Sequence, residues 1–338
     1  MVTETTRPRV LSLVGPTLRQ ELFTEEALKD LHAFADVTWI ESDDRWISEQ
    51  LAREIPGYEA LVTTWGSPKI TREVLDAADH LKLVAHSAGS VKALVDEDVL
   101  RQVKVSSAAI AMAPAVAECT LILVMLGLRY LHEFDHGMRR EGRWDGPKAH
   151  GKPREIAGST IGVVGAGGVG RIFIGQCRAL GANVNVYDPY LSEADTAALG
   201  ATKMELDDLM AASPIVAVTA PVTPETHHMI GARQLALMPD NGFLVNTGRS
   251  WTVDQDALLA ELQSGRLRAG LDVYDKEPLA VDHPYRSLPN VILLPHVAGA
   301  TVEARHRQGD CVVRDVKNAL TGQPLAHEVT LERYAILA

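Results

Sequence analysis

The sequence has few cysteines, and they are too far apart to act together. Only three of the 338 residues are cysteine, at Cys119, Cys177 and Cys311, and no two of them form a C-x-x-C pair. This number is too small for a disulfide framework, and the spacing does not suit a structural zinc site. We therefore expect no metal ion to be bound.

Basic residues are also few relative to acidic ones. Acidic residues outnumber them, the net charge is −11, and no run of Lys and Arg stands out. Such a chain is poorly suited to binding a phosphate backbone, so we expect no nucleic-acid partner. The first ten residues, MVTETTRPRV, lack the apolar core of a signal peptide, which favours a cytoplasmic protein.

One long apolar run has to be considered as a membrane span. Residues Ala108–Leu128 are almost wholly apolar, but the run contains Pro114 and Glu118. A charge at the centre of a bilayer costs at least ~2.5 kcal/mol. A buried helix preceded by a loop explains the run better, so no membrane partner is expected.

The rest of the chain is typical of a folded α/β protein with two domains. Its length exceeds the ~250–300 residues at which one hydrophobic core stops growing. In the first hundred residues, short apolar segments alternate with segments that have helical spacing, which predicts a parallel sheet covered on both faces. The strands are expected at Val10–Val14, Val37–Ile40, Ala60–Thr64, Lys82–His86 and Val103–Ser107, and the helices at Glu21–Ala35, Ile47–Ile55 and Thr71–Ala78.

A second alternating series follows a long helix (Ala115–Arg139) and an extended connection (Glu141–Gly158). We expect strands at Thr160–Gly165, Asn183–Tyr187, Ile215–Val218, Gly242–Asn246, Ala269–Val273 and Val291–Leu294. Helices are expected at Val169–Leu180, Glu205–Ala211, Ala232–Leu237, Asp254–Ser264 and Thr301–Leu320. The sequence therefore predicts two doubly wound parallel-sheet domains with a ligand cleft between them.

The strongest motif is a glycine-rich turn between a predicted strand and a predicted helix. Gly165 allows the tight turn, Gly167 lets the backbone approach a pyrophosphate, and Gly170 allows close packing of helix on strand. The start of the helix offers unpaired N–H groups to phosphates. The next strand ends on Asp188, where an acid would hydrogen-bond a ribose hydroxyl. This combination predicts dinucleotide binding, and the carboxylate favours NAD over NADP.

Three polar residues follow later strands of the second series. They are Arg249, Glu277 and His296. Ligands of open α/β sheets bind beyond the carboxyl ends of the strands, so these side chains can converge on one crevice. A guanidinium binds a carboxylate through two parallel hydrogen bonds, an imidazole donates or accepts a proton, and a carboxylate orients the imidazole.

Several ordered motifs resemble the NAD-dependent D-isomer-specific 2-hydroxyacid dehydrogenases, from about residue 60 to 330. The motifs are Val116-Ala117-Glu118, Pro221-Val222-Thr223-Pro224-Glu225-Thr226, Leu244-Val245-Asn246-Thr247-Gly248-Arg249, Leu271-Asp272-Val273-Tyr274, Glu277-Pro278-Leu279 and Pro295-His296-Val297-Ala298-Gly299. The resemblance implies that Arg249 binds the substrate carboxylate, His296 is the acid/base, and Glu277 pairs with it. It also implies cofactor contacts at Gly168, Val169, Ala220, Thr226, Thr247, Gly248, Asp272 and Gly299.

The same resemblance implies a domain division and an oligomeric state. Residues 1–108 and 304–338 would form a flavodoxin-like substrate domain, and residues 109–303 a Rossmann coenzyme domain. A homodimer would form through the coenzyme domain. The chain departs from the family pattern at Ala88-Gly89-Ser90-Val91-Lys92 and at Ser250-Trp251. We expect Gly89 and Ser90 to face the substrate, a small 2-hydroxy or 2-oxo acid. Trp251 would either face the substrate as well or point outward or toward a dimer partner.

Two alternatives to this interpretation stay open. An NAD(H)-sensing, corepressor-like binding protein uses the same fold, and fold alone does not separate it from an enzyme. If the chain is an enzyme, 3-phosphoglycerate is an alternative substrate. No clear second anion site stands out for it: Arg45, Lys69 and Lys92 could serve, but they fit ordinary surface charges better.

Overall fold

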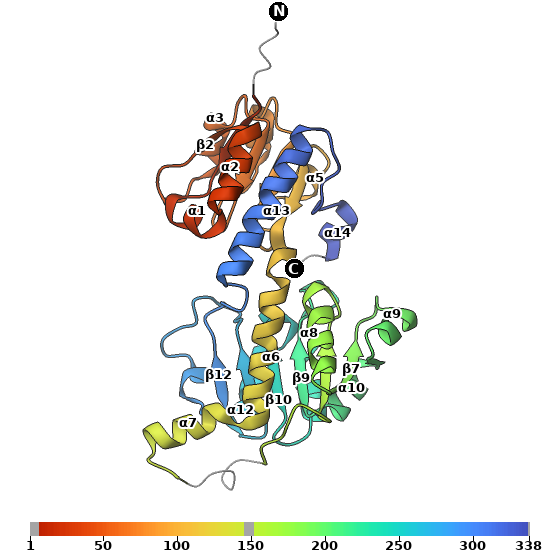
Figure 1. The fold of residues 1–338 in the computed structure, drawn as a ribbon. Helices are drawn as coiled ribbons and strands as arrows, with labels where there is room; N and C mark the ends of the chain where they lie inside the picture. Colours follow the sequence, from red (N-terminus) through yellow and green to blue (C-terminus); the bar gives the residue numbers. More distant parts are fainter. Residues whose placement is uncertain (1–6, 145–151, 337–338) are drawn as a thin grey trace, which may run out of the picture. The chain divides into compact units, whose positions relative to one another are not determined.

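The computed structural model describes residues 7–144 and 152–336, which form two compact units (Figure 1). The first unit, here called the terminal unit, combines residues 1–112 with residues 300–338. The second, called the central unit, comprises residues 113–299. Each unit is a parallel sheet with helices packed on it, as the alternating segments predict.

The sheet of the terminal unit has five parallel strands in the order β2-β1-β3-β4-β5. Two clusters of buried apolar side chains cover its two faces. The strands are β1 (Arg9–Ser12), β2 (Asp36–Trp39), β3 (Ala60–Thr63), β4 (Leu83–His86) and β5 (Lys104–Ser107). The helices are α1 (Pro16–Leu22), α2 (Glu25–Phe34), α3 (Ser48–Glu54), α4 (Arg72–Ala77), α5 (Glu97–Leu100), α13 (Val302–Leu320) and α14 (Leu331–Ile336), with a 3-10 helix at Ala108–Met112.

The helix predicted over Glu21–Ala35 is two helices in the structure. Helix α1 ends at Leu22, and the side chain of Thr24 accepts a hydrogen bond from the Ala27 N–H at 3.1 Å, which caps the start of α2. The threonine followed by two glutamates is a recognisable helix start, so apolar spacing alone made the prediction too long here.

Helix α13 returns the end of the chain to the terminal unit. A Cβ on Gly309 would lie 2.0 Å from the Leu22 carbonyl oxygen, so only glycine lets α13 approach α1 this closely. Val312, Val313 and Val316 then pack into the cluster that covers one face of the sheet.

The sheet of the central unit has seven parallel strands in the order β12-β11-β10-β9-β6-β7-β8. The strands are β6 (Thr160–Val164), β7 (Asn183–Tyr187), β8 (Thr202–Lys203), β9 (Ile215–Val218), β10 (Phe243–Asn246), β11 (Arg268–Leu271) and β12 (Val291–Leu293). The helices are α6 (Ala113–Arg129), α7 (Leu131–Arg140), α8 (Gly168–Ala179), α9 (Glu193–Ala198), α10 (Leu206–Ala212), α11 (Ala232–Leu237) and α12 (Gln255–Gln263), with 3-10 helices at Ser250–Thr252 and Pro284–Ser287. Neither β8 nor α9 was expected from the sequence, and β11 ends two residues before the predicted strand does.

The long apolar run forms a core helix of the central unit. On length and composition Ala108–Arg129 could cross a membrane, but Leu123, Val124 and Leu128 of α6 are buried in the core with residues of α8 and β10. A Cβ on Gly127 would lie 2.3 Å from the Phe243 ring, which shows how closely α6 packs on the sheet.

The predicted helix Ala115–Arg139 is interrupted at Tyr130. This residue has a left-handed backbone with φ 54°, which ends α6 and starts α7 in a new direction. Of the predicted connection Glu141–Gly158, residues 145–151 lie outside the described residues, and the described residues after the gap form no helix or strand.

Candidate active site

The candidate functional residues of the central unit follow the strands of one sheet. Because all its strands are parallel, their carboxyl ends lie at the same edge, where ligands of open α/β sheets bind. The strand order reverses between β6 and β9, which are neighbours in the sheet. The residues that follow the strand ends include Gly165, Asp188, Ala220, Thr247, Asp272 and His296.

The glycine-rich turn has the geometry that its sequence predicts. Gly165 follows β6 with φ 94°, and a Cβ there would lie 2.7 Å from the Ala220 backbone nitrogen. A Cβ on Gly170 would lie 2.1 Å from the Gly165 carbonyl oxygen. Side chains are therefore excluded at both positions, and α8 starts directly against the ends of β6 and β9.

The start of α8 has room for a phosphate group. Gly167 and Gly168 are exposed, and a Cβ on Gly167 would meet nothing within 4 Å. No side chain of the described residues caps this helix end, so its N–H groups are free to bind a pyrophosphate. Val169 follows them, half-buried in the first turn. These residues fit a dinucleotide.

Asp188 is held against the same turn. One oxygen of its carboxylate accepts the Ala166 N–H at 2.7 Å and the other accepts the Tyr190 N–H at 2.9 Å. An ionised carboxylate has about four acceptor sites, so lone pairs are left for ribose hydroxyls. The side chain therefore both fixes the glycine-rich turn and can bind a ribose.

His296 and Glu277 form a hydrogen-bonded pair. The imidazole Nδ1 lies 2.7 Å from Glu277 Oε2, and the other carboxylate oxygen accepts the Tyr274 N–H at 3.0 Å. The side chain of His296 is 48% exposed, so the ring is accessible while its Nδ1 is fixed. With Nδ1 bonded to the carboxylate, Nε2 is the nitrogen available to a substrate.

Asp272 positions the loop that carries His296. It is 1% exposed, and its two oxygens accept the N–H groups of Val297 at 2.7 Å and Ala298 at 3.0 Å. Burial raises the pKa of Asp272, and the two backbone hydrogen bonds oppose that rise. His296 has φ 56°, and these bonds to the next two residues hold it in this uncommon conformation. The sequence alone did not reveal this role of Asp272.

Arg249 is half-buried at the end of the turn after β10. Its Nη1 donates to the Gly248 carbonyl at 2.8 Å, and this is the one hydrogen bond of its guanidinium among the described residues. Burial lowers the pKa of Arg249, and the nearby Glu277 carboxylate raises it. Most of the planar fork of N–H donors is therefore left for an anionic ligand.

The remaining predicted cofactor residues lie in turns at this edge of the sheet. Thr226 donates to the Pro221 carbonyl at 2.7 Å and accepts the Thr223 N–H at 2.7 Å, which closes the turn after β9. Gly248 approaches Ala220, because a Cβ there would lie 3.0 Å from the Ala220 carbonyl oxygen. Gly299 is the last residue of the central unit.

A threonine of α6 supports this edge and was missed from the sequence. Thr120 is fully buried, and its hydroxyl donates to the Val116 carbonyl at 2.7 Å. Its oxygen lies 2.6 Å from Thr247 Oγ1, so the Thr247 hydroxyl is the donor in that pair. The two residues are 127 positions apart, and no local pattern links them.

Trp251 lies beside the two adjacent histidines of the chain. Trp251 is 49% exposed, and its ring centroid is 6.3 Å from that of His227. The rings of His227 and His228 stack at 4.1 Å, and the His228 N–H donates to the Trp251 carbonyl at 2.7 Å. This arrangement ties Trp251 to the turn that contains Thr226.

Gly89 and Ser90 lie in the terminal unit, on the loop after β4, and buried side chains hold this loop. Gln308 donates to the Ser87 carbonyl at 2.6 Å, and Ser107 donates to the Gly89 carbonyl at 2.8 Å. His86 bonds to the backbone of Ser90 and to Thr63 Oγ1, the latter at 3.0 Å. The loop is thus fixed through its backbone, and its role toward the substrate stays a prediction.

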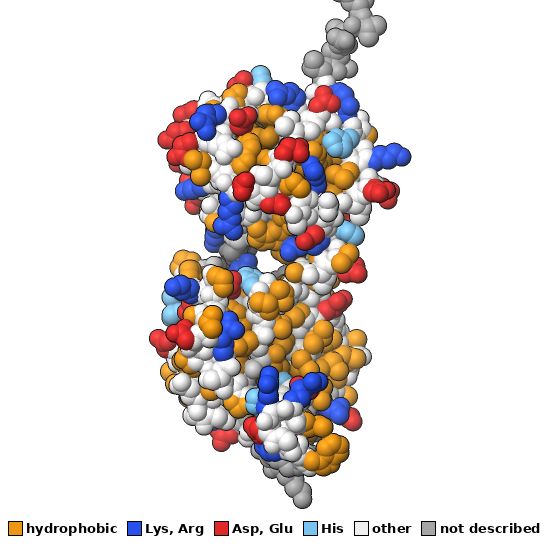
Figure 2. All heavy atoms as spheres, turned by 90° about the vertical axis from the view of Figure 1, so that its left-hand side faces the viewer, with side chains coloured by type: hydrophobic (Ala, Val, Ile, Leu, Met, Phe, Trp, Pro, Cys, Tyr) orange, Lys and Arg blue, Asp and Glu red, His pale blue; other side chains and the backbone are white. Residues whose placement is uncertain are grey.

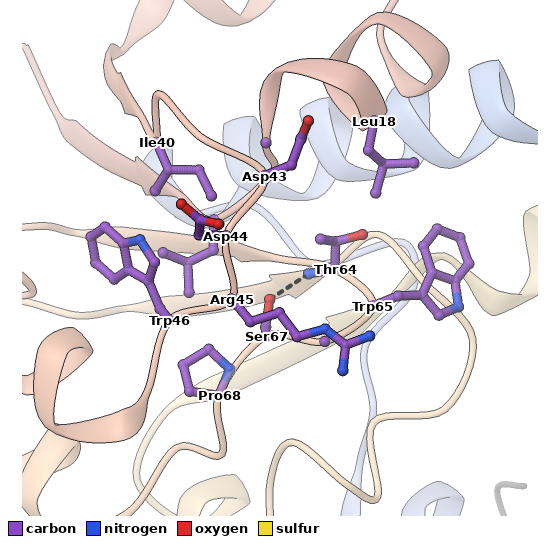
Figure 3. Close-up of a pocket in the computed structure, with 13 residues that line it drawn as sticks. Leu18, Ile40, Asp43, Asp44, Arg45, Trp46, Thr64, Trp65, Ser67 and Pro68 are labelled. Carbon is purple, nitrogen blue, oxygen red and sulfur yellow. Dashed lines mark hydrogen bonds between the residues drawn. The ribbon is translucent and has the colours of Figure 1, made fainter.

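Two cavities lie near candidate residues. One of about 660 Å³ in the central unit is lined by Glu277, His296 and seven neighbours, among them Tyr274 and Arg286. A smaller one, about 140 Å³, lies in the terminal unit beyond the ends of β1, β2 and β3. Figure 3 shows Trp46 and Trp65 on either side of this smaller cavity, with Arg45 between them. The buried Thr64 hydroxyl at its wall has no hydrogen-bond partner among the described residues.

Comparison with known proteins identifies the class. The family model for the D-isomer specific 2-hydroxyacid dehydrogenase, NAD binding domain, matches residues 121–298. A glyoxylate reductase from Thermofilum pendens is 33% identical over 309 residues, covering 89% of this chain and 90% of that protein. A D-3-phosphoglycerate dehydrogenase from Archaeoglobus fulgidus is 34% identical over 285 residues, covering 84% of this chain.

The chain belongs to the D-isomer specific 2-hydroxyacid dehydrogenase family, and its cofactor is NAD(H). It spans about half (53%) of the length of the D-3-phosphoglycerate dehydrogenase from Archaeoglobus fulgidus. The crystal structure of apo D-mandelate dehydrogenase from Rhodotorula graminis has the same fold, with a TM-score of 0.82 and 24% identity over 96% of this chain and 97% of that one.

Proposed function

We propose that the chain transfers a hydride between NAD(H) and C2 of a small 2-hydroxy or 2-oxo acid. NADH, when bound, supplies the hydride for reduction. The observation that carries the proposal is the pair of His296 and Glu277 at the strand-end edge that also holds the glycine-rich turn. A positioned imidazole with a free Nε2 and a carboxylate on Nδ1 is suited to acid–base catalysis.

In reduction, His296 donates the Nε2 proton to the substrate oxygen as the alkoxide forms. In oxidation, the neutral ring takes this proton back. Glu277 stabilises the charged ring at 2.7 Å and fixes its orientation, and Asp272 holds the backbone that carries it. Each of these residues thus acts on the proton and not on the hydride.

Arg249 would bind the substrate carboxylate through its free N–H donors. Its partial burial supports this role, because charge-assisted hydrogen bonds are stronger away from bulk water. Trp251, in the 3-10 helix directly after Arg249, would limit the size of the substrate. We propose that Gly89 and Ser90 supply further contacts to it.

The cofactor contacts follow the same geometry. The N–H groups at Gly168 and Val169 would bind the pyrophosphate, and Asp188 the adenosine ribose. Asp272 would also accept from the nicotinamide carboxamide, since a carboxylate has more acceptor sites than its two backbone bonds use. Ala220, Thr226, Thr247, Gly248 and Gly299 would line the site.

We also propose a homodimer that forms through the central unit. Exposed apolar side chains on α6 and α7 support this, since large exposed apolar patches mark interaction surfaces. They are Ile122, Met125, Leu131 and Met138. Figure 2 shows hydrophobic side chains gathered on one side of the central unit.

A turnover assay tests the proposal directly. NADH oxidation would be measured with glyoxylate, hydroxypyruvate, a branched 2-oxo acid and 3-phosphohydroxypyruvate. We expect turnover with at least one short 2-oxo acid, lost on replacement of His296. Tight NADH binding without turnover of any of them would favour an NAD(H)-sensing binding protein instead.

A further inference from the structure

A second cluster of reactive side chains lies in the terminal unit and includes none of the candidate active-site residues. Cys311 and Asp315 lie one turn apart on α13, and His327 lies in the segment after this helix. The Cys311 sulfur is 3.5 Å from His327 Nε2, and His327 Nδ1 is 3.0 Å from an oxygen of Asp315.

These contacts fix which nitrogen of His327 carries the proton. The Asp315 carboxylate only accepts hydrogen bonds, so Nδ1 must be the protonated nitrogen that donates to it. In the neutral ring, Nε2 then carries the lone pair, and this lone pair faces the Cys311 thiol. The thiol is the donor and the imidazole the acceptor.

The cluster is held by three separate parts of the terminal unit. Asp315 is 1% exposed, and its second oxygen accepts the Ala326 N–H at 2.8 Å. The backbone carbonyl of His327 accepts the Ser107 N–H of β5 at 3.1 Å. The ring of His327 is therefore fixed by Asp315 and its backbone by β5, and Cys311 itself is half-buried.

We propose that Cys311 is a modification site whose thiol, with His327 as general base and Asp315 orienting that base, is oxidised by small uncharged hydroperoxides. A thiol, an imidazole within reach and a third group that orients the imidazole are the parts of an activated nucleophile. The half-buried position favours small, uncharged reagents over bulky ones.

The reaction balances with hydrogen peroxide as the oxidant. The thiol proton passes to His327 Nε2 as the sulfur attacks one peroxide oxygen. A sulfur–oxygen bond forms, the oxygen–oxygen bond breaks, and the leaving hydroxide takes the proton back from His327 to become water. The sulfur is oxidised to a sulfenic acid and the peroxide is reduced.

Cys119 is a natural comparison within the same chain. Burial raises the pKa of both thiols to about 11, so neither is a thiolate at rest near neutral pH. Around Cys311, Arg307 and Arg314 lower the pKa of the thiol, and Asp310 and Asp315 raise it. Both cysteines are half-buried. What distinguishes Cys311 is the imidazole at its sulfur.

The test compares the three cysteines in the intact chain. The folded protein is treated with hydrogen peroxide and a sulfenic-acid trap, and peptide mass spectrometry measures labelling at Cys119, Cys177 and Cys311. We expect Cys311 to be labelled at least roughly tenfold faster than Cys119, because a positioned base accelerates such steps by ~10²–10⁴. Equal rates at Cys311 and Cys119 in the unmodified chain would overturn the proposal.

Two variants test whether His327 acts as a general base or only holds the segment after α13 in place. His327→Gln should lower labelling of Cys311 to the rate of Cys119, and Asp315→Asn should lower it less. If His327 only held the segment in place, its loss would open the site and raise labelling. An unchanged or raised rate at Cys311 in His327→Gln would therefore overturn the role of the imidazole.

Discussion

The two units are built alike and differ in the residues at the ends of their strands. Each is a parallel sheet covered by helices, and each has a histidine associated with a strand end. His86, the last residue of β4, is 5% exposed and bonded to Thr63, whereas the side chain of His296 is 48% exposed and paired with a carboxylate. The fold alone therefore does not show which of the two histidines can take part in a reaction.

The environment of each histidine explains the difference. Burial lowers the pKa of His86 to about 4, so this ring is neutral near pH 7 and serves to hold the loop that contains Ser90. His296 has an accessible Nε2, and its Nδ1 is held by the Glu277 carboxylate at 2.7 Å. The first is part of the core, and the second can exchange a proton with a substrate.

The largest effect is expected from removing the imidazole of the central unit. His296→Gln should lower kcat for reduction by ~10²–10⁴, because the proton donor is lost while the fold is kept. The measurement is steady-state NADH oxidation with the best 2-oxo acid. The exposed His80 of the terminal unit is the control, and His80→Gln should keep kcat within about twofold. Similar losses in both variants would contradict the comparison.

His86 should act on stability and not on chemistry. Its pKa of about 4 lies below the usual 6.5, so the unfolded chain binds this proton first as the pH falls. The stability of the terminal unit should therefore fall between about pH 6.5 and pH 4, by roughly 3 kcal/mol in all. Urea unfolding as a function of pH measures this slope, and His86→Gln should flatten it. The same slope in the variant would assign the acid sensitivity to another group.

At Arg249, the planar geometry of the guanidinium should matter for substrate binding as well as its charge. Arg249→Lys keeps the charge but loses the planar fork, so kcat/KM should fall by the equivalent of ~1.5–3 kcal/mol, about tenfold or more. Arg101→Lys, at an exposed position directly after α5 in the terminal unit, is the matched control and should leave kcat/KM unchanged. An unaltered kcat/KM in Arg249→Lys on every substrate would exclude the anchoring role.

Glycine substitutions should separate packing from cofactor binding. Gly170→Ala and Gly309→Ala each place a Cβ about 2 Å from a backbone oxygen, and each should cost ~1–3 kcal/mol of stability. Only Gly170→Ala should also weaken NADH binding, as measured by fluorescence titration. At Gly175 of α8 a Cβ meets nothing, so Gly175→Ala should stabilise by up to ~1 kcal/mol. Weaker NADH binding in Gly309→Ala would contradict the claim that Gly309 serves packing alone.

Much of the fold and of the site is predictable because it depends on local sequence. The glycine-rich turn, the strand before it and the residues after each strand lie close together in sequence, and the strand ends share one edge of a sheet. The pairing of Glu277 with His296 was expected from the resemblance and is present at 2.7 Å. Gly265, which directly follows the predicted helix Asp254–Ser264, has a left-handed backbone with φ 73°, a conformation that often follows a helix end.

The features that were missed depend on contacts between distant residues or on single backbone angles. The left-handed Tyr130 breaks a helix whose apolar spacing continues through it. Thr120 reaches Thr247 across 127 positions, and Asp272 holds the backbone of residues 297 and 298. The hydrophobic periodicity of a single segment contains no information about contacts with distant residues.

The most direct measurement of the central claim is reductive kcat/KM in Glu277→Gln, with the NADH dissociation constant measured beside it. Glu277 holds the His296 ring at Nδ1 and so presents Nε2 to the substrate. Without this charged partner, kcat/KM should fall by about tenfold or more, while the NADH dissociation constant stays nearly the same. An unchanged kcat/KM in Glu277→Gln would mean that Glu277 does not support the proton donor.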